Sequence, residues 1–215
     1  MAERKRPRRT RERILETALL LFNVLGEPNV TTADIANEME ISPGNLYYHF
    51  RNKGEIVAEL FGAFEQRLVP LLVQPAGRPP DVEDLWLLLH LLFEAMWDHR
   101  FFFRDLDEIV SRDRTLASRF ARIMRGGSRT VIELCRGMVA SGTMHASERE
   151  IVALADNVAL VATYWISYQR ISGGGQAQGG ANLDRAAYQV LSLIAPFLRG
   201  KARALLDRLG RDYLG

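Results

Sequence analysis

The residues whose types and spacing could do chemistry lie close together, between positions 31 and 50. Two short helices are expected there, because Thr31 and Thr32 precede one and Ser42-Pro43 opens the other. A few residues join them, which is the sequence form of a helix-turn-helix. The outer face of the second helix carries two aromatic side chains and no charge that is fixed at neutral pH. That face consists of Pro43, Gly44, Asn45, Tyr47, Tyr48 and His49. It is typical of an element that enters the major groove of duplex DNA, where its first residues meet base edges and its later ones meet phosphates.

The inner faces of the same two helices are apolar. Ala36 is small where the helices would cross closely, and the residues spaced to pack the pair together are Ile35, Ala36, Ile41, Leu46 and Phe50. The pattern therefore predicts a compact pair of helices that exposes one polar and aromatic surface.

The sequence argues against catalysis and against a metal site. It contains no glycine-rich phosphate loop after a strand, no His-Glu-x-x-His and no nucleophile elbow. Cys135 is the single cysteine, which excludes an intramolecular disulfide and a cysteine-built metal site, and its apolar context indicates a core residue. His49 has no other ligand-type side chains at metal-binding spacing. We therefore expect no enzyme activity, no cofactor and no metal.

Helical periodicity, punctuated by glycine and proline, predicts an all-α fold without internal repeats. One helix should run from about Ile14 to Leu25 and another from Asn52 to about Leu72, followed by a loop at 74–80. Further helices are expected at 82–96, 101–111, 116–140 with a bend at Gly126-Gly127, 148–171 and 184–209. A glycine-rich loop should occupy 173–180, and Pro196 should kink or divide the last helix.

Positive charge is concentrated at the start of the chain. Residues 1–13 carry seven cations against Glu3 and Glu12, although the whole chain has a net charge of only +2. Such an arm is typical of a protein with a polyanionic partner. It could follow the DNA backbone or enter a minor groove, or it could be a solvated tail, and the sequence does not decide between these.

The motif resembles the DNA-binding domain of the tetracycline-repressor (TetR) family. The similarity rests on Thr-Thr, Ile-Ala, Ser-x-Gly-x-Leu-Tyr-Tyr-His-Phe and Lys53, it covers about residues 10–60, and its spacing needs no gaps. It implies two domains, a three-helix DNA-binding domain with its basic arm at 1–60 and a larger helical effector-binding and dimerisation domain at 61–215.

The resemblance also implies roles for single residues. Thr32, Ser42, His49 and Lys53 would contact the phosphate backbone. Pro43, Gly44 and Asn45 would lie against the bases, and Tyr47 and Tyr48 would reach phosphates and thymine methyl groups. Pro43 stands where the family often has a longer side chain, so fewer hydrogen bonds to bases are expected at that position.

A helix-turn-helix of this size makes few contacts alone, so we expect a homodimer on a palindromic operator of double-stranded DNA. The segments 148–171 and 184–209 each carry an apolar stripe. By resemblance they would meet their copies as a four-helix bundle, although both stripes could equally be internal core. The interface residues predicted in this way are Ile151, Leu154, Val158, Trp165, Tyr188, Leu191, Ile194 and Leu198.

The resemblance further implies a small-molecule effector that releases DNA. Aromatic and methionine side chains are the candidates for its pocket, although simple packing is the alternative for each. They are Trp86, Leu89, Phe93, Trp97, Phe102, Phe103, Met124, Met138, Trp165 and Tyr168. This composition favours an apolar or aromatic effector over a sugar or nucleotide.

These expectations combine into one function, a sequence-specific transcriptional repressor released by a hydrophobic effector. The alternatives are a DNA-bound interaction protein of nucleoid organisation and a transcriptional activator. The protein is expected in the bacterial cytoplasm with the nucleoid, not in a membrane, because the longest apolar run, Leu85–Phe93, is interrupted by His90 and is shorter than the roughly 18 residues of a span.

Overall fold

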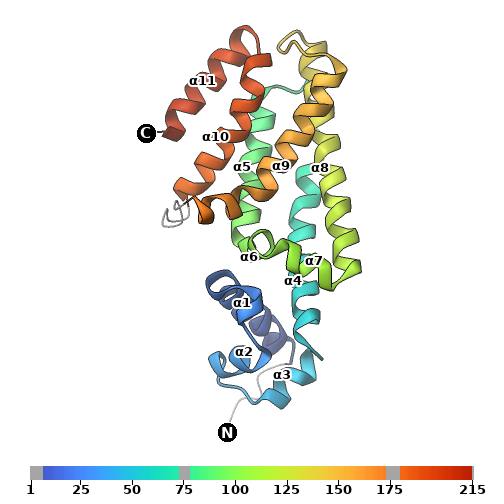
Figure 1. Cartoon of the computed structure of the whole chain (residues 1–215), viewed down its shortest axis with the longest axis vertical. Coiled ribbons are helices and arrows are strands. Elements are labelled where there is room, and N and C mark those ends of the chain that lie inside the picture. Colours follow the sequence, from blue (N-terminus) through green and yellow to red (C-terminus); the bar gives the residue numbers. More distant parts are fainter. Residues whose placement is uncertain (1–6, 73–77, 173–179, 215) are drawn as a thin grey trace. The chain divides into compact units, whose positions relative to one another are not determined.

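The structure, a computed structural model, describes residues 7–72, 78–172 and 180–214, and all regular elements in these ranges are helical (Figure 1). The predicted all-α fold is therefore confirmed. Residues 1–6 of the basic arm, residues 74–77 of the loop expected at 74–80 and residues 173–179 of the glycine-rich loop expected at 173–180 lie outside the described residues. The helices are α1 (Pro7–Leu25), α2 (Thr32–Glu38), α3 (Pro43–His49), α4 (Lys53–Leu68), α5 (Val82–Asp98), α6 (Arg100–Arg104), α7 (Leu106–Arg112), α8 (Arg114–Ala140), α9 (Glu148–Ile171), α10 (Gly180–Ile194) and α11 (Gly200–Leu214). Short 3₁₀ turns follow three of them, at Glu27–Asn29 (η1), Val69–Leu72 (η2) and Ala195–Phe197 (η3).

The chain divides into two compact units, and the first comprises Met1–Gln66 together with Asp98–Ala117. Short helices α6 and α7 thus pack with the helix-turn-helix, whereas a sequence boundary at residue 60 assigned them to the body. The physical reason is a cluster of aromatic rings. The Phe101 ring lies 5.2 Å from that of Phe22, the Phe102 ring 5.2 Å from that of Phe61, and the Phe103 ring 5.6 Å from that of Phe64. All six of these rings are buried, so they form part of the core of the unit.

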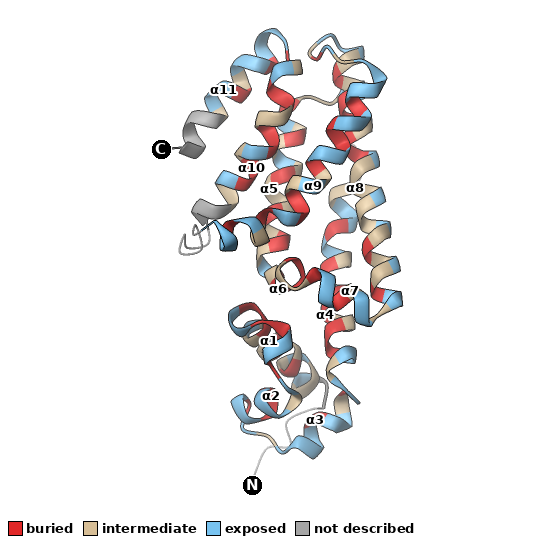
Figure 2. Ribbon diagram, viewed as in Figure 1, coloured by how far each residue is buried: buried red, intermediate tan, exposed pale blue. Residues whose placement is uncertain are grey.

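The second unit comprises Arg67–Trp97 and Ser118–Gly215. In it α9 packs on α10 and α10 on α11 (Figure 1). Its core includes Leu89 of α5, Met138 of α8 and Val158 of α9, and Figure 2 shows buried segments on each of these helices. Helix α9 is long and apolar enough to cross a membrane by length and composition alone, but eight of its side chains are buried in the unit. We interpret it as a core helix.

Proline and backbone geometry explain where the helices differ from the predicted ranges. The expected helix to Leu72 ends as α-helix at Leu68, because Pro70 has no N–H to donate and disfavours helical geometry in the residue before it. The expected helix at 101–111 is divided at Asp105, whose φ of −110° and ψ of 22° are not helical. Pro196 separates α10 from α11, as predicted, whereas α8 continues through Gly126-Gly127 as one helix.

Gly137 of α8 is required by close packing. A Cβ atom built at this position would lie 2.2 Å from Cγ and 2.5 Å from Cδ of Pro80, far inside van der Waals contact, and a proline ring cannot rotate away. Gly127 of the same helix has no heavy atom within 4 Å of its Cβ position. The two glycines are therefore a matched pair, one constrained by its neighbour and one not.

We expect Gly137→Ala to lower the free energy of unfolding by about 1–3 kcal/mol, because the added methyl group displaces Pro80. Gly127→Ala should raise it by about 0.5–1 kcal/mol, because alanine loses less backbone entropy in a helix. Urea unfolding followed by circular dichroism measures both. Equal stability of the two variants would contradict the described packing.

Candidate nucleic-acid interface

The two helices of the motif each begin at a side-chain cap. The Thr31 hydroxyl accepts a hydrogen bond from the Asp34 amide at 3.2 Å, and the Asp34 carboxylate accepts one from the Thr31 amide at 2.8 Å, which completes a capping box. These bonds with Thr31 lower the pKa of the Asp34 carboxyl. The Ser42 hydroxyl accepts from the Asn45 amide at 3.2 Å, and Pro43 follows at the first helical position. The sequence therefore fixes the starts of both α2 and α3.

Burial holds α2 and α3 together. Ile35 and Ala36 of α2, Leu46 of α3 and Phe50 directly after α3 are all buried. Between the helices, Glu40 has a φ of 54°, which reverses the chain, and the Ile41 amide donates to the Ala36 carbonyl at 3.0 Å. Four of the five residues predicted for the inner face are thus buried, and the fifth, Ile41, is half-buried.

The outer face of α3 is exposed, as Figure 2 shows. Tyr48 is 79% exposed and Tyr47 is 51% exposed, while His49 is half-buried with its ring 5.1 Å from that of Tyr48. Ser42, Pro43, Gly44 and Asn45 are exposed as well. A Cβ atom at Gly44 would have only the Ser42 hydroxyl near it, at 4.0 Å, so packing within the chain does not require a glycine there. At Gly44 no side chain covers the backbone, which is therefore accessible beside the rings of Tyr47 and Tyr48.

Thr32 and Tyr47 connect the two helices on their outer side. Their hydroxyl groups are 3.0 Å apart and share a hydrogen bond. Both residues were predicted to contact phosphates, and the structure brings them together at one place. Two adjacent hydroxyls can each donate to an anionic oxygen once their mutual bond opens.

Lys53, predicted to neutralise a phosphate, has its three donors engaged within the chain. Its Nζ lies 2.8 Å from the Glu27 carbonyl oxygen, 2.9 Å from the Val30 carbonyl oxygen and 3.0 Å from Oε1 of Glu27. Its side chain is 24% exposed. A direct phosphate contact would require at least one of these partners to be exchanged.

Helix α1 begins at Pro7, so four cations of the predicted basic arm lie on it, namely Arg8, Arg9, Arg11 and Arg13. Arg11 lies on α1, where its guanidinium is ion-paired with Glu59 of α4 and stands 4.6 Å from the centroid of the Phe50 ring. It therefore stabilises the packing of α1 and α4 around the end of α3.

A polar cluster surrounds Glu27, and no sequence motif marks it. This residue is buried beside Lys53, Asp105 and Arg112. Its only sequence signal is an acidic residue next to the glycine that ends α1, and its partners are 26 to 85 positions away.

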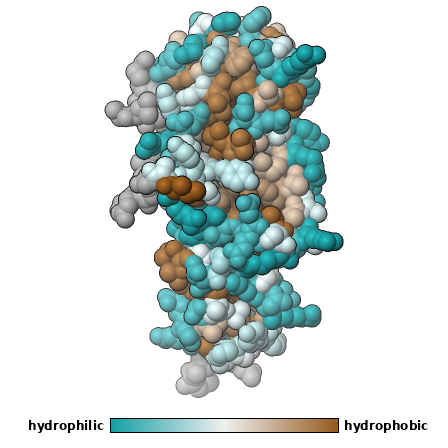
Figure 3. Space-filling view, viewed as in Figure 1, coloured by the Kyte–Doolittle hydropathy of each residue, from teal (hydrophilic) through white to brown (hydrophobic). Residues whose placement is uncertain are grey.

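The apolar stripe predicted as a dimer interface faces the core of its own chain. The buried members are Ile151, Leu154, Val158, Trp165, Leu191, Ile194 and Leu198, and Tyr188 is half-buried. Their burial agrees with the alternative of internal core, since α9 and α10 use these side chains to pack within one protomer. A second apolar stripe of α9 is exposed instead, and it consists of Val152, Leu160, Tyr164, Tyr168 and Ile171. Figure 3 shows apolar surface over the part of the chain that contains α9 and α10.

The predicted effector residues are dispersed. Phe102 and Phe103 belong to the first unit, whereas Leu89, Phe93 and Met138 are buried in the core of the second. Trp86 stacks on His90, Trp97 is half-buried, and Met124 accepts a hydrogen bond from the Thr163 hydroxyl at 3.4 Å.

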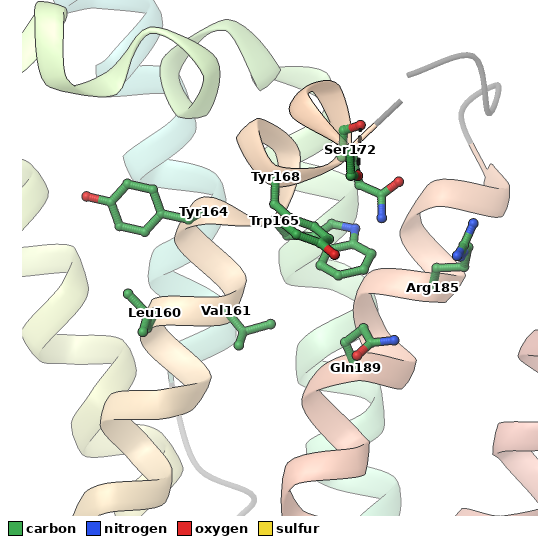
Figure 4. A pocket seen from close by; sticks show the side chains of 9 residues that line it. Leu160, Val161, Tyr164, Trp165, Tyr168, Ser172, Arg185 and Gln189 are labelled. Atoms are coloured by element: carbon green, nitrogen blue, oxygen red, sulfur yellow. Dashed lines mark hydrogen bonds between the residues drawn. The ribbon is translucent and has the colours of Figure 1, made fainter. Parts of the chain in front are cut away.

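Trp165 and Tyr168 do line a hollow of about 680 Å³ between α9 and α10 (Figure 4). Arg185 and Gln189 of α10 add polar groups to its other wall. The remaining lining residues are Leu160, Val161, Tyr164, Gln169 and Ser172. The volume lies within the range of small-molecule sites.

Metal and thiol chemistry have no support among residues 7–72, 78–172 and 180–214. No group of three or more His, Cys, Asp and Glu side chains in these ranges could hold a metal ion. Burial raises the pKa of the Cys135 thiol to about 11, so the reactive thiolate is scarce at neutral pH.

Comparison with known proteins gives matches over both units. A model described as "Bacterial regulatory proteins, tetR family" matches residues 14–60, and one described as "Bacterial transcriptional repressor" matches residues 63–206. The regulator YttP of Bacillus subtilis is 26% identical over 114 residues, which are 53% of this chain and 54% of that protein. The curated relatives match this chain over about half of their own length or less.

Solved structures match over nearly the whole chain. A TetR-family transcriptional regulator from Marinobacter aquaeolei is 34% identical, with a TM-score of 0.86, over 95% of this chain and 98% of that one. A SmeT–triclosan complex, 20% identical with a TM-score of 0.61 over 90% of this chain and 94% of that one, shares the fold.

Proposed function

Because this chain belongs to the TetR family of bacterial regulatory proteins, we propose that it is a sequence-specific DNA-binding repressor that a small hydrophobic effector releases from its operator. The observation that carries this proposal is the outer face of α3. A seven-residue helix that buries only Leu46 exposes two aromatic rings to water, which is unfavourable unless a partner covers them. The groove of a duplex is the partner whose shape and chemistry this face fits.

Each exposed residue of the motif has a role in this proposal. Pro43, Gly44 and Asn45, at the start of α3, lie against base edges, and the bare backbone at Gly44 allows close approach. Tyr47, Tyr48 and His49 follow along the helix toward the sugar-phosphate backbone. Thr32 and Ser42 add hydroxyl groups at the starts of α2 and α3. Hydroxyl contacts to phosphates fix the register of the helix, and the first residues of α3 supply the sequence preference.

Self-association follows from the size of the site, since one copy of α3 contacts only part of a groove. We assign the contact between copies to the exposed stripe of α9, because it is apolar over much of its length. Leu160 is 59% exposed and Ile171 is 81% exposed. Apolar side chains at such spacing bury effectively against a copy of the same helix.

The effector is proposed to bind at the hollow between α9 and α10, which shares Leu160, Tyr164 and Tyr168 with the exposed stripe and so borders the contact between copies. Trp165, Val161 and Tyr168 give it apolar and aromatic walls, which favour a hydrophobic compound. The triclosan bound by SmeT, an apolar aromatic molecule, is in keeping with this class. Release from DNA requires that the effector favour the geometry with weak DNA affinity, by about 1–3 kcal/mol of coupling. The protein would act in the cytoplasm, on the nucleoid.

Tyr48→Ala is expected to weaken binding to an operator about tenfold, equivalent to about 1.4 kcal/mol, because it removes the most exposed ring of α3. The operator is obtained by selecting bound duplexes from a genomic fragment library, and affinity is measured by fluorescence anisotropy at fixed salt. Leu20→Ala, which shortens another exposed apolar side chain of the same unit, should bind like the parent chain. Parental affinity of Tyr48→Ala would remove α3 from the interface.

Leu160→Glu is expected to convert the dimer into monomers, because it places a charge within the apolar contact between copies. Sedimentation equilibrium of both forms over a range of concentrations measures the shift. Leu87→Glu on α5 alters a side chain of similar exposure, 48%, away from the α9 stripe and should remain dimeric. A dimeric Leu160→Glu variant would show that another surface joins the copies.

Val161→Trp is expected to raise the concentration of effector needed for DNA release at least tenfold, because the larger ring fills the hollow. The effector is first found by screening hydrophobic aromatic compounds for release of labelled operator. Ala153→Trp adds the same ring at an exposed position of α9 outside the hollow and should respond like the parent chain. An unchanged response of Val161→Trp would place the effector elsewhere.

A further inference from the structure

Glu27 is a buried carboxylate held between two cations from distant parts of the sequence. The residue is 3% exposed. Its Oε1 lies 3.0 Å from Nζ of Lys53, at the start of α4, and its Oε2 lies 3.3 Å from a guanidinium nitrogen of Arg112, at the end of α7. A buried carboxylate is tolerated only when it is paired, so the three side chains are expected to depend on one another.

The contacts of Lys53 reach both sides of the helix-turn-helix. Its two carbonyl partners, Glu27 and Val30, lie in the segment that leads into α2. Lys53 itself begins α4, three residues after Phe50, the residue that follows α3. One ammonium group therefore ties the entry of α2 to the exit of α3. Movement of Lys53 would allow the pair of helices to shift as a body.

The segment from α6 to α7 also forms hydrogen bonds to Glu27 and to the end of α1. The Glu27 amide donates to the Asp105 carboxylate at 3.0 Å, and Arg104 donates to the Phe22 carbonyl oxygen at 2.6 Å. The Asn23 side chain donates to the Asp98 carbonyl oxygen at 2.7 Å and accepts from the Phe101 amide at 3.1 Å. All of these groups belong to the first unit. The end of α1 is thus fixed to α6 and α7 by hydrogen bonds at several points.

We propose that Lys53 is a positioning residue for the DNA-contacting helices and not a phosphate ligand, and that the Glu27 carboxylate, shared with Arg112, holds it in place. The proposal rests on the function proposed above. In this proposal, operator affinity depends partly on side chains that do not contact DNA. It also makes the alignment of α3 sensitive to α7, since Arg112 and Lys53 share one carboxylate.

The test compares Lys53→Met and Glu27→Gln with the parent chain in three measurements. These are affinity for a selected operator, affinity for a random duplex of equal length, and the dependence of operator affinity on salt. We expect each variant to lose at least fivefold in operator affinity, because α3 is no longer aligned with the bases. Affinity for random duplex should stay within about twofold, and the salt slope should stay unchanged.

A phosphate contact by Lys53 gives a different result and would overturn the proposal. Lys53→Met would then lower affinity for both duplexes and reduce the salt slope by about 0.9. Glu27→Gln would leave operator affinity unchanged or raise it, since it releases the ammonium for DNA. A purely structural role would lower the melting temperature of both variants but leave both affinities of the folded protein at parental values, which also overturns the proposal.

Matched controls separate these effects from a change in net charge. Glu16→Gln removes an exposed carboxylate of α1, and Lys201→Met removes an exposed cation of α11, and both should keep the parental ratio of operator to random binding. If Glu27→Gln does not fold, Arg112→Gln provides the test, because that guanidinium is half-exposed and Lys53 keeps its contacts. We expect Arg112→Gln to lower the ratio two- to threefold, and a parental ratio would overturn the proposal.

The failure of this inference is distinguishable from failure of the proposed function. If the parent chain binds no duplex in the selection, the proposed function fails. If the parent chain binds and Glu27→Gln binds with the same ratio, only the positioning role is wrong.

Discussion

Seven-residue helices cannot hold their own shape in water, and the first unit depends on that constraint. Helices of this length are far below what is needed for independent stability, so α2 and α3 persist only because Ile35, Leu46 and Phe50 are buried and because Thr31 and Ser42 cap them. Only a few buried residues are needed to pack α2 and α3. The outer face of α3 does not pack within the chain and is available to contact another molecule.

Helices α6 and α7 also depend on packing against other helices for their stability. They are also short, and they are packed against α1 and α4 through Phe101 and Phe102 and hydrogen-bonded to the end of α1 through Arg104 and Asp105. Helices α2 and α3 therefore belong to a unit that also includes α6 and α7, which follow α5 in sequence. The chain passes between the two units within α4 after Gln66, at the end of α5 before Asp98 and within α8 after Ala117.

Local sequence signals allowed helix starts to be predicted. Caps are encoded by neighbours, so Ser42-Pro43 gave the start of α3 correctly. Neighbouring residues do not determine which face of a helix packs on the core. Helix α9 has two apolar stripes, one through Leu154 and one through Leu160, and periodicity cannot tell which packs on its own chain. The partners of Lys53 were missed because Glu27 lies 26 positions away.

The central claim is that paired copies of α3 enter successive major grooves of one duplex. Hydroxyl-radical footprinting of the chain on a selected fragment tests it most directly. The account predicts two protected patches related by the symmetry of the site, with centres about 10 base pairs apart or a multiple of that spacing. A single patch, or uniform cleavage at concentrations that saturate binding, would contradict it.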